Sequence, residues 1–80
     1  MSEAEAREIL ALMRAGKRFS TRFQEEGWGL EAAEHGAFRL WSYRYEPDGT
    51  EERSDDRIGE DAAIARLRLY AFARITAGLR

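Results

Sequence analysis

The chain contains no cysteine, and its 80 residues include only one histidine, one proline and one lysine, Lys17. The absence of cysteine excludes disulfide bonds and thiolate metal sites, and it fits a reducing compartment. His35 has no second histidine to act with and lies in an expected tight turn before Gly36. A single imidazole in a turn is not a catalytic constellation. We therefore predict no catalytic site, no cofactor site and no metal site.

Long apolar runs are also absent. No stretch approaches the roughly 20 apolar residues that a membrane span needs. The first residues, MSEAE, are acidic and lack the basic-then-apolar order of a signal peptide. We therefore expect no membrane association and a cytoplasmic location. The length predicts a single domain over residues 1–80.

Charge is unevenly distributed along a chain whose net charge is −2. Residues 46–61 carry eight acids against two arginines, whereas residues 62–80 carry four arginines and no acid. The acidic run DGTEERSDDRIGED lacks the alternating Asp/Asn ligands and the terminal glutamate of a calcium loop. We interpret it as a solvated turn that leads into a helix.

Hydrophobic periodicity predicts an α+β fold. Residues 2–15 are expected to form a helix that begins with a capping box, Ser2 and Glu5. Its apolar residues recur at helical spacing and form one stripe: Ala6, Ile9, Leu10 and Met13, widened by Leu12. From Phe19 the period changes to two, and turns are expected at Glu26-Gly27, at His35-Gly36 and in EPDGT. A three-residue loop in EPDGT would place Tyr43 beside Arg53, and a short polar strand from Thr50 to Ser54 could pair back. A final helix is expected from about residue 60 to residue 77. The predicted architecture is an N-terminal helix, a three- to four-stranded antiparallel meander and a C-terminal helix, with both helices packed on one sheet face.

Two-residue turns at Glu26-Gly27 and His35-Gly36 would fix which side chains share a face. They place Phe23 opposite Leu30 and Leu30 opposite Trp41, and directly opposed residues lie on the same face. A slip of one residue would send half of this set to the other side. The sequence thus predicts one inner, core face that carries most of the aromatic residues: Phe19, Phe23, Trp28, Leu30, Trp41, Tyr43 and Tyr45.

The same pairing predicts the rest of the sheet. Arg39 is expected on the inner face, opposite Ala32, where it could reach the margin of the sheet or pair with Glu5 or Glu8 on the first helix. The outer face is expected to carry a small apolar island of Ala33, Phe38 and Leu40. Polar residues would surround this island: Arg18, Arg22, Gln24, Glu31, Ser42 and Arg44.

The predicted last helix has a second apolar stripe beside the face that should cover the sheet. Its small side chains permit close approach of another helix. Either the first helix covers this stripe within one chain, or a second chain does so in a homodimer. The stripe consists of Ala62, Ala65, Leu69 and Ala73, with Thr76 beyond them.

The order helix, three strands, helix is similar to that of the double-stranded RNA-binding domain. That family places a lysine-rich cluster at the start of its second helix to span a groove. The corresponding stretch here, SDDRIGEDAA, is strongly acidic. The resemblance is one of topology, and no binding residue is carried over from it.

These observations predict a small, non-enzymatic protein-interaction or regulatory module that self-associates. Its contact surface would be either the stripe of Ala62, Ala65, Leu69 and Ala73 or the island of Ala33, Phe38 and Leu40. The alternative is weak nucleic-acid binding by the outer sheet face, with Arg18, Arg22 and Arg44 as contacts. The overall negative charge and the acidic segment disfavour this alternative.

Overall fold

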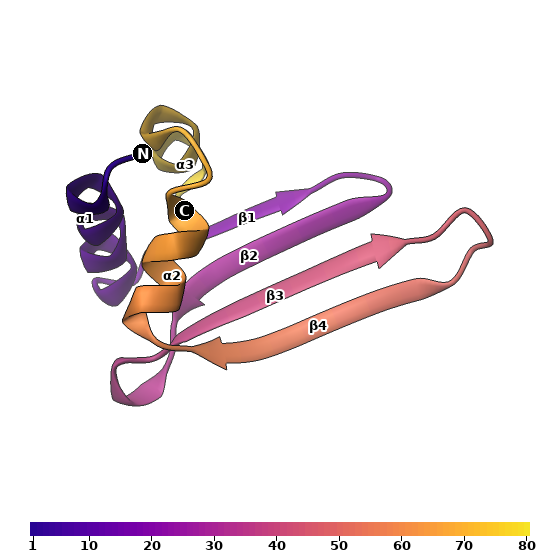
Figure 1. The fold of residues 1–80 in the computed structure, drawn as a ribbon, viewed down its shortest axis with the longest axis horizontal. Helices are drawn as coiled ribbons and strands as arrows, with labels where there is room; N and C mark the ends of the chain where they lie inside the picture. Colours follow the sequence, from indigo (N-terminus) through magenta and orange to yellow (C-terminus); the bar gives the residue numbers. More distant parts are fainter.

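The structure, a computed structural model that describes residues 1–80, confirms the α+β prediction: one helix, four antiparallel strands in a single sheet, then two further helices. The strands follow one another across the sheet in the order β1-β2-β3-β4 (Figure 1). The elements are α1 (Glu3–Arg14), β1 (Arg18–Arg22), β2 (Glu26–Ala32), the short 3₁₀ turn η1 (Glu34–Gly36), β3 (Phe38–Tyr45), β4 (Glu51–Ile58), α2 (Glu60–Leu67) and α3 (Phe72–Gly78).

Helix α1 begins at the predicted capping box. The Ser2 hydroxyl accepts the Glu5 N–H at 3.1 Å, and the Glu5 carboxylate accepts the Ser2 N–H at 2.9 Å. This backbone hydrogen bond lowers the pKa of Glu5. The predicted apolar stripe is confirmed as the buried face of the helix, and Gly16 follows the helix with a φ of +107°. The stripe consists of Ala6, Ile9, Leu10 and Met13.

The first hairpin turns earlier than predicted. The Phe23 N–H donates to the Glu26 carbonyl, and Phe19 rather than Phe23 lies opposite Leu30. This shift of four residues is even, so Phe19 and Trp28 remain on the inner face with Leu30. Phe23 leaves the ladder and is 60% exposed, so its predicted place in the core is wrong. The turn moves because Gly27 is needed inside β2, where the Tyr43 ring covers it.

The second hairpin contains one residue more than predicted. His35 and Gly36 form the centre of the turn with φ values of 57° and 74°, and the Ala37 N–H donates to the Glu34 carbonyl. However, Ala33 rather than Glu34 donates to the Ala37 carbonyl and closes the ladder. Glu34 is therefore left out of the pairing. Leu30 lies opposite Leu40 instead of Trp41.

This slip of one residue exchanges the two faces of β3. Phe38 is completely buried in the core, and Leu40 packs against the core from the same face. The predicted outer island of Ala33, Phe38 and Leu40 is therefore wrong. The predictions that Trp41, Tyr43 and Tyr45 belong to the core and that Arg39 lies on the inner face are wrong for the same reason: all four lie on the outer face, and Ser42 and Arg44 lie on the inner one.

The third hairpin confirms its prediction. The loop Pro47-Asp48-Gly49 has Gly49 at a φ of +87°, and it places Tyr43 opposite Arg53. The Asp48 carboxylate accepts hydrogen bonds from the Thr50 hydroxyl at 2.6 Å and from the Thr50 N–H at 2.9 Å. These hydrogen bonds lower the pKa of Asp48. Strand β4 continues to Ile58, beyond the predicted end at Ser54.

The predicted last helix is broken into two. Helix α2 ends at Leu67, residues 68–71 form a turn, and α3 follows. The break redirects the chain so that Ile75 enters the core and Leu79 pairs with Phe19 at the edge of β1. Packing is tight there, because a Cβ on Gly78 would lie 2.5 Å from the Phe19 ring. Tertiary packing here overrides local helix propensity.

The helices cover only one end of the sheet. In Figure 1 the strands extend well beyond α1, α2 and α3, toward the β1–β2 and β3–β4 turns. Strands β3 and β4 have eight residues each and so span about 26 Å, whereas α2 is only about 12 Å long. The inner face of β3 changes accordingly, from Phe38 and Leu40 beneath the helices to Ser42 and Arg44 beyond them. None of the three helices has the length and apolar character that a membrane-spanning segment requires.

The register predicts opposite consequences for two phenylalanine truncations. Phe38→Ala should reduce the free energy of unfolding by about 3–5 kcal/mol, because it opens a cavity in the core. Phe23→Ala should change it by less than about 0.5 kcal/mol, because the ring is exposed. Urea unfolding of both variants measures the difference. Equal costs, or a larger cost for Phe23→Ala, would contradict the register.

Candidate functional site

The outer face of the sheet carries three aromatic side chains in a row, Trp41, Tyr43 and Tyr45, here called the aromatic strip. The Trp41 and Tyr43 rings are stacked, with centroids 6.4 Å apart and planes at 6°, and Tyr45 meets Tyr43 edge-on at 5.9 Å. No helix covers this face, because the helices pack against the opposite one.

Two glycines of β2 let these rings lie against the backbone. Gly29 lies opposite Trp41 and Gly27 lies opposite Tyr43. A Cβ on Gly29 would overlap the indole of Trp41, and a Cβ on Gly27 would come within 2.5 Å of the Tyr43 ring. Cross-strand pairing of an aromatic ring with glycine shields exposed backbone and pins the register. One side of each ring therefore stabilises the sheet, and the other side faces outward.

Two polar contacts hold the strip in place. The Tyr43 hydroxyl donates a 2.6 Å hydrogen bond to the Phe23 carbonyl in the β1–β2 turn. The Arg22 guanidinium carbon lies 4.8 Å from the centre of the Trp41 ring. A cation at this distance from an indole is attracted to the ring face, an interaction of about 0.5–1 kcal/mol at exposed sites.

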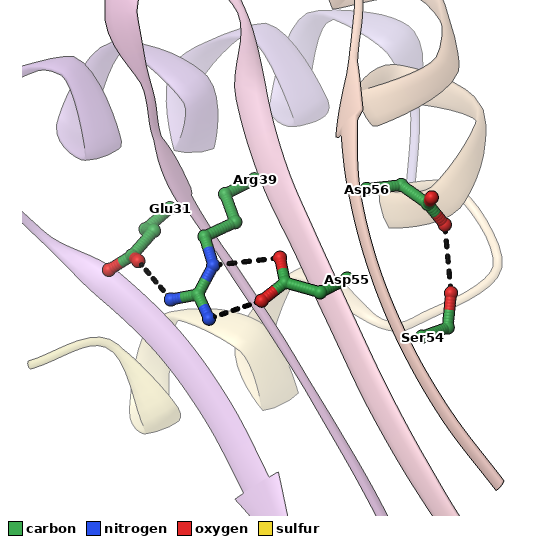
Figure 2. A network of polar contacts seen from close by, with 5 residues as sticks. All are labelled: Glu31, Arg39, Ser54, Asp55 and Asp56. Carbon is green, nitrogen blue, oxygen red and sulfur yellow. Dashed lines mark hydrogen bonds and ion pairs between the residues drawn. The ribbon is translucent and has the colours of Figure 1, made fainter.

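Arg39 lies next to the strip and joins three strands. Its guanidinium donates two hydrogen bonds to Asp55 on β4, at 2.9 and 2.6 Å, and one to Glu31 on β2, at 3.0 Å (Figure 2). The bidentate pair lowers the pKa of Asp55 and raises that of Arg39. All three side chains are at least 31% exposed, so solvent screens the pair and its contribution to stability is small.

The outer face is more basic than the chain as a whole. Its strands present five arginines against three carboxylates, although the net charge of the chain is −2. Three of the arginines form ion pairs within the chain, but Arg18 and Arg22 form none. The arginines are Arg18, Arg22, Arg39, Arg53 and Arg57, and the carboxylates are Glu31, Glu51 and Asp55.

The sheet edges are less suited to contact than its faces. Strand β4, with the sequence EERSDDRI, is charged along almost its whole length, which blocks edge-to-edge pairing. The free edge of β1 is partly occupied, because Arg18 exchanges backbone hydrogen bonds with Arg80. The open surfaces of the sheet are therefore its outer face and the far half of its inner face.

The far half of the inner face forms a groove of about 850 Å³ with α2, α3 and the turn between them, here called the inner groove. Arg66 and Arg74 reach it from the helices, and Arg44 reaches it from β3. Figure 2 shows that β4 places side chains on both faces of the sheet: Asp55 points toward Arg39, whereas Ser54 and Asp56 point away from it. The Ser54 hydroxyl donates a 2.8 Å hydrogen bond to the Asp56 carboxylate.

The structure separates the three predicted nucleic-acid contacts. Arg18 and Arg22 lie on the outer face as expected, but Arg44 lies on the inner face, opposite Glu26 and Glu52. These three arginines therefore do not form one surface. The sequence contains a signal for the true arrangement, the alternating glycines of EGWGLEA in β2, which mark where aromatic rings cross the strand.

The predicted small-residue stripe is exposed along its whole length, so α1 does not cover it. Ala62 and Ala65 lie on the outward side of α2, and Leu69 follows in the turn with 74% of its surface exposed. Ala73 belongs to α3 and is separated from the others by the break. The prediction of one continuous helical stripe is therefore wrong, although Leu69 remains a large exposed apolar side chain.

Neither a cluster of metal ligands nor a similar protein is found for this chain. No group of three or more histidine, cysteine, aspartate and glutamate side chains is placed to hold a metal ion. The lone histidine, His35, is exposed in η1. No protein-family model, no curated protein and no solved structure shows a significant match to this chain.

The Arg39–Asp55 pair predicts a specific titration. In Arg39→Gln the pKa of Asp55 should rise toward its usual value, because the hydrogen bonds that favour the carboxylate are lost. Since the pKa is lowered in the folded chain, the pair stabilises the fold above the usual aspartate pKa, and this contribution disappears as pH falls through the lowered value. Carboxyl-carbon NMR measures the titration.

Asp48 provides the internal control for this titration. Its pKa is lowered by Thr50 and not by Arg39, so it should titrate identically in the parent and in Arg39→Gln. An Asp55 titration that is the same in both proteins would contradict the pairing.

Proposed function

We propose that this chain is a non-enzymatic protein-interaction module that binds an acidic segment or surface of another protein on its outer sheet face. The observation that carries the proposal is the aromatic strip: Trp41 and Tyr43 lie against Gly29 and Gly27 and are partly exposed, on a face that no helix covers. In a small domain, aromatic side chains placed outside the core mark an interaction surface.

Composition supports a protein partner. Tryptophan, tyrosine and arginine are the residue types most enriched among those that dominate binding energy at protein interfaces. The outer face brings all three together, with Arg22 stacked on Trp41 and Tyr45 44% exposed beside them. The rings are held in place by the glycines and by the Tyr43 hydrogen bond, so little side-chain entropy is lost on binding.

Charge supports an acidic partner. Arg18 and Arg22 have no carboxylate partner within the chain, and the face carries more arginines than carboxylates. A ligand that brings one or two carboxylates would complete these pairs. Complementary charge of this kind raises the association rate and selects against basic partners.

Panning a random peptide library against the immobilised chain tests this proposal. The selected peptides should be rich in aspartate and glutamate. Tyr45→Ala and Arg22→Glu should each weaken their binding by about thirtyfold, the loss expected for a hot-spot residue. Arg68→Glu is the matched control, because Arg68 is exposed on the helical side and forms no ion pair. Selected peptides without acidic residues, or equal binding by all variants, would refute the proposal.

Binding of single-stranded nucleic acid is the second candidate, favoured by one observation. The parallel Trp41 and Tyr43 rings, with Arg22 on Trp41, could stack successive bases. Three of the five arginines on the face already hold carboxylates, which leaves little free charge to follow a phosphate backbone. Fluorescence anisotropy with single-stranded oligonucleotides decides: binding that falls steeply with salt and is lost in Arg22→Glu would favour nucleic acid over an acidic protein.

Self-association and a cytoplasmic location remain predictions from the sequence. For the homodimer, the exposed Leu69 offers the contact, flanked by Ala62 and Ala65. Light scattering on a sizing column should give about twice the 9.2 kDa of one chain, and Leu69→Glu should return the mass to that of the monomer. Leu12→Glu, a charge placed on a half-exposed leucine of α1, should leave the dimer intact. A monomeric parent would refute the prediction.

A further inference from the structure

The inner groove brings together two arginines from the helices that have no carboxylate partner. Arg66 belongs to the last turn of α2, and Arg74 belongs to α3. Both line the groove, and neither forms an ion pair, although five other arginines of the chain do so. Tyr70, in the turn between the two helices, also lines the groove, and both the Arg66 and the Arg74 guanidinium groups lie near its ring.

Aromatic rings, rather than carboxylates, hold Arg66 in position. Its guanidinium carbon lies 4.6 Å from the centre of the Trp28 ring and 5.9 Å from that of Tyr70. Trp28 and Tyr70 are themselves stacked, with centroids 5.0 Å apart. A guanidinium fixed by stacking keeps its N–H donors available for a ligand.

The hydrogen-bond state of Arg66 indicates an incomplete site. Its Nε is shielded from solvent and has no hydrogen-bond partner, the only buried side-chain polar atom in the chain without one. The two terminal nitrogens are not shielded, and they also have no acceptor in the structure. Buried donors are normally satisfied, so this guanidinium lacks an acceptor, which a ligand can supply at the terminal nitrogens that remain accessible from the groove.

Arg74 adds a second positive charge to the same place. Its guanidinium carbon lies 5.5 Å from the centre of the Tyr70 ring. Thr21 and Ser42 supply hydroxyl groups from the floor of the groove, and neither hydroxyl has a hydrogen-bond partner within the chain. Guanidinium and hydroxyl donors that line one groove fit an oxyanion.

The other charges around the groove favour a small ligand over a polymer. At the end farther from the helices, Arg44 forms no ion pair, but it lies opposite Glu26 and Glu52 in the two ladders, and these two carboxylates lower the positive potential there. A polyanion that continued past Arg66 and Arg74 would meet these carboxylates and the acidic β4. The groove volume of about 850 Å³ lies within the range of small-molecule sites.

From these observations we propose that the inner groove binds a small organic oxyanion, a phosphate monoester or a carboxylate, between the guanidinium groups of Arg66 and Arg74. The ligand body would extend over Thr21 and Ser42 toward Arg44. This site lies on the sheet face opposite the aromatic strip, and it does not depend on the proposal for protein binding.

Nitrogen-15 NMR of the whole chain tests the site with three probes: phenyl phosphate, benzoate and uncharged phenol. The Arg66 Nε–H should give a resolved signal because it is shielded from solvent. Phenyl phosphate, benzoate or both should shift this signal, together with the Ser42 amide, in a saturable way, and phenol should not. The relative affinities of the two anions identify the preferred oxyanion.

Variants separate a defined site from general attraction of anions. Arg74→Gln should weaken binding of the preferred anion by about tenfold, the loss of one charge-assisted hydrogen bond, without changing the fold, because this side chain is exposed. Arg66→Lys keeps the charge but loses the planar fork, and it should weaken binding similarly. Arg68→Gln, outside the groove, is the control. Shifts spread over all arginines, equal effects of the three variants, or no saturable shift would overturn the proposal.

Discussion

The faces of β3 and β4, and with them the two candidate surfaces, depend on one residue left out of the ladder, Glu34. Because Ala33 instead of Glu34 closes the ladder with Ala37, β3 is displaced by one residue against β2. Side chains alternate along a strand, so this displacement decides which half of β3 enters the core. Strand β4 pairs with β3 and inherits the same choice. Phe38 is buried and the aromatic strip faces outward as a direct result.

Helix length sets the second constraint. Three short helices cover the inner face only near Phe19, Leu30 and Phe38, and the strands continue beyond them. The far half of the sheet is therefore exposed on both sides, with different chemistry on each. Outside, aromatic rings lie on glycine and carry Arg22; inside, Arg66 and Arg74 face a groove floored by hydroxyl groups. One thin sheet thus supports two separate candidate surfaces.

Local chemistry made part of this fold predictable from the sequence. The Ser2–Glu5 capping box, the stripe along α1 and the loop Pro47-Asp48-Gly49 each depend on residues close in the chain, and each is confirmed. The His35-Gly36 turn also lies at the predicted position, but these two residues can form the centre of either a two-residue or a three-residue loop. The choice between them depends on burying Phe38 beneath the helices, which is a tertiary effect.

The same limit applies to the candidate surfaces. The prediction that Arg18 and Arg22 lie on the outer face is correct, because the register of β1 differs from the predicted one by an even number of residues. The prediction for Arg44 is wrong, because β3 is displaced by one residue. The break after Leu67 has no glycine or proline to mark it, since it arises from the packing of Ile75 and Leu79 around Phe19. The inner groove depends on that break and was not predicted.

Nuclear Overhauser effects between β2 and β3 test the central claim most directly. The account predicts backbone contacts between Leu30 and Leu40, contacts between the Gly29 α-protons and the Trp41 indole, and strong upfield shifts of those α-protons. Contacts that pair Leu30 with Trp41, with Gly29 α-protons at ordinary shifts, would contradict it: Glu34 would then belong to the ladder, and the aromatic strip would belong to the core.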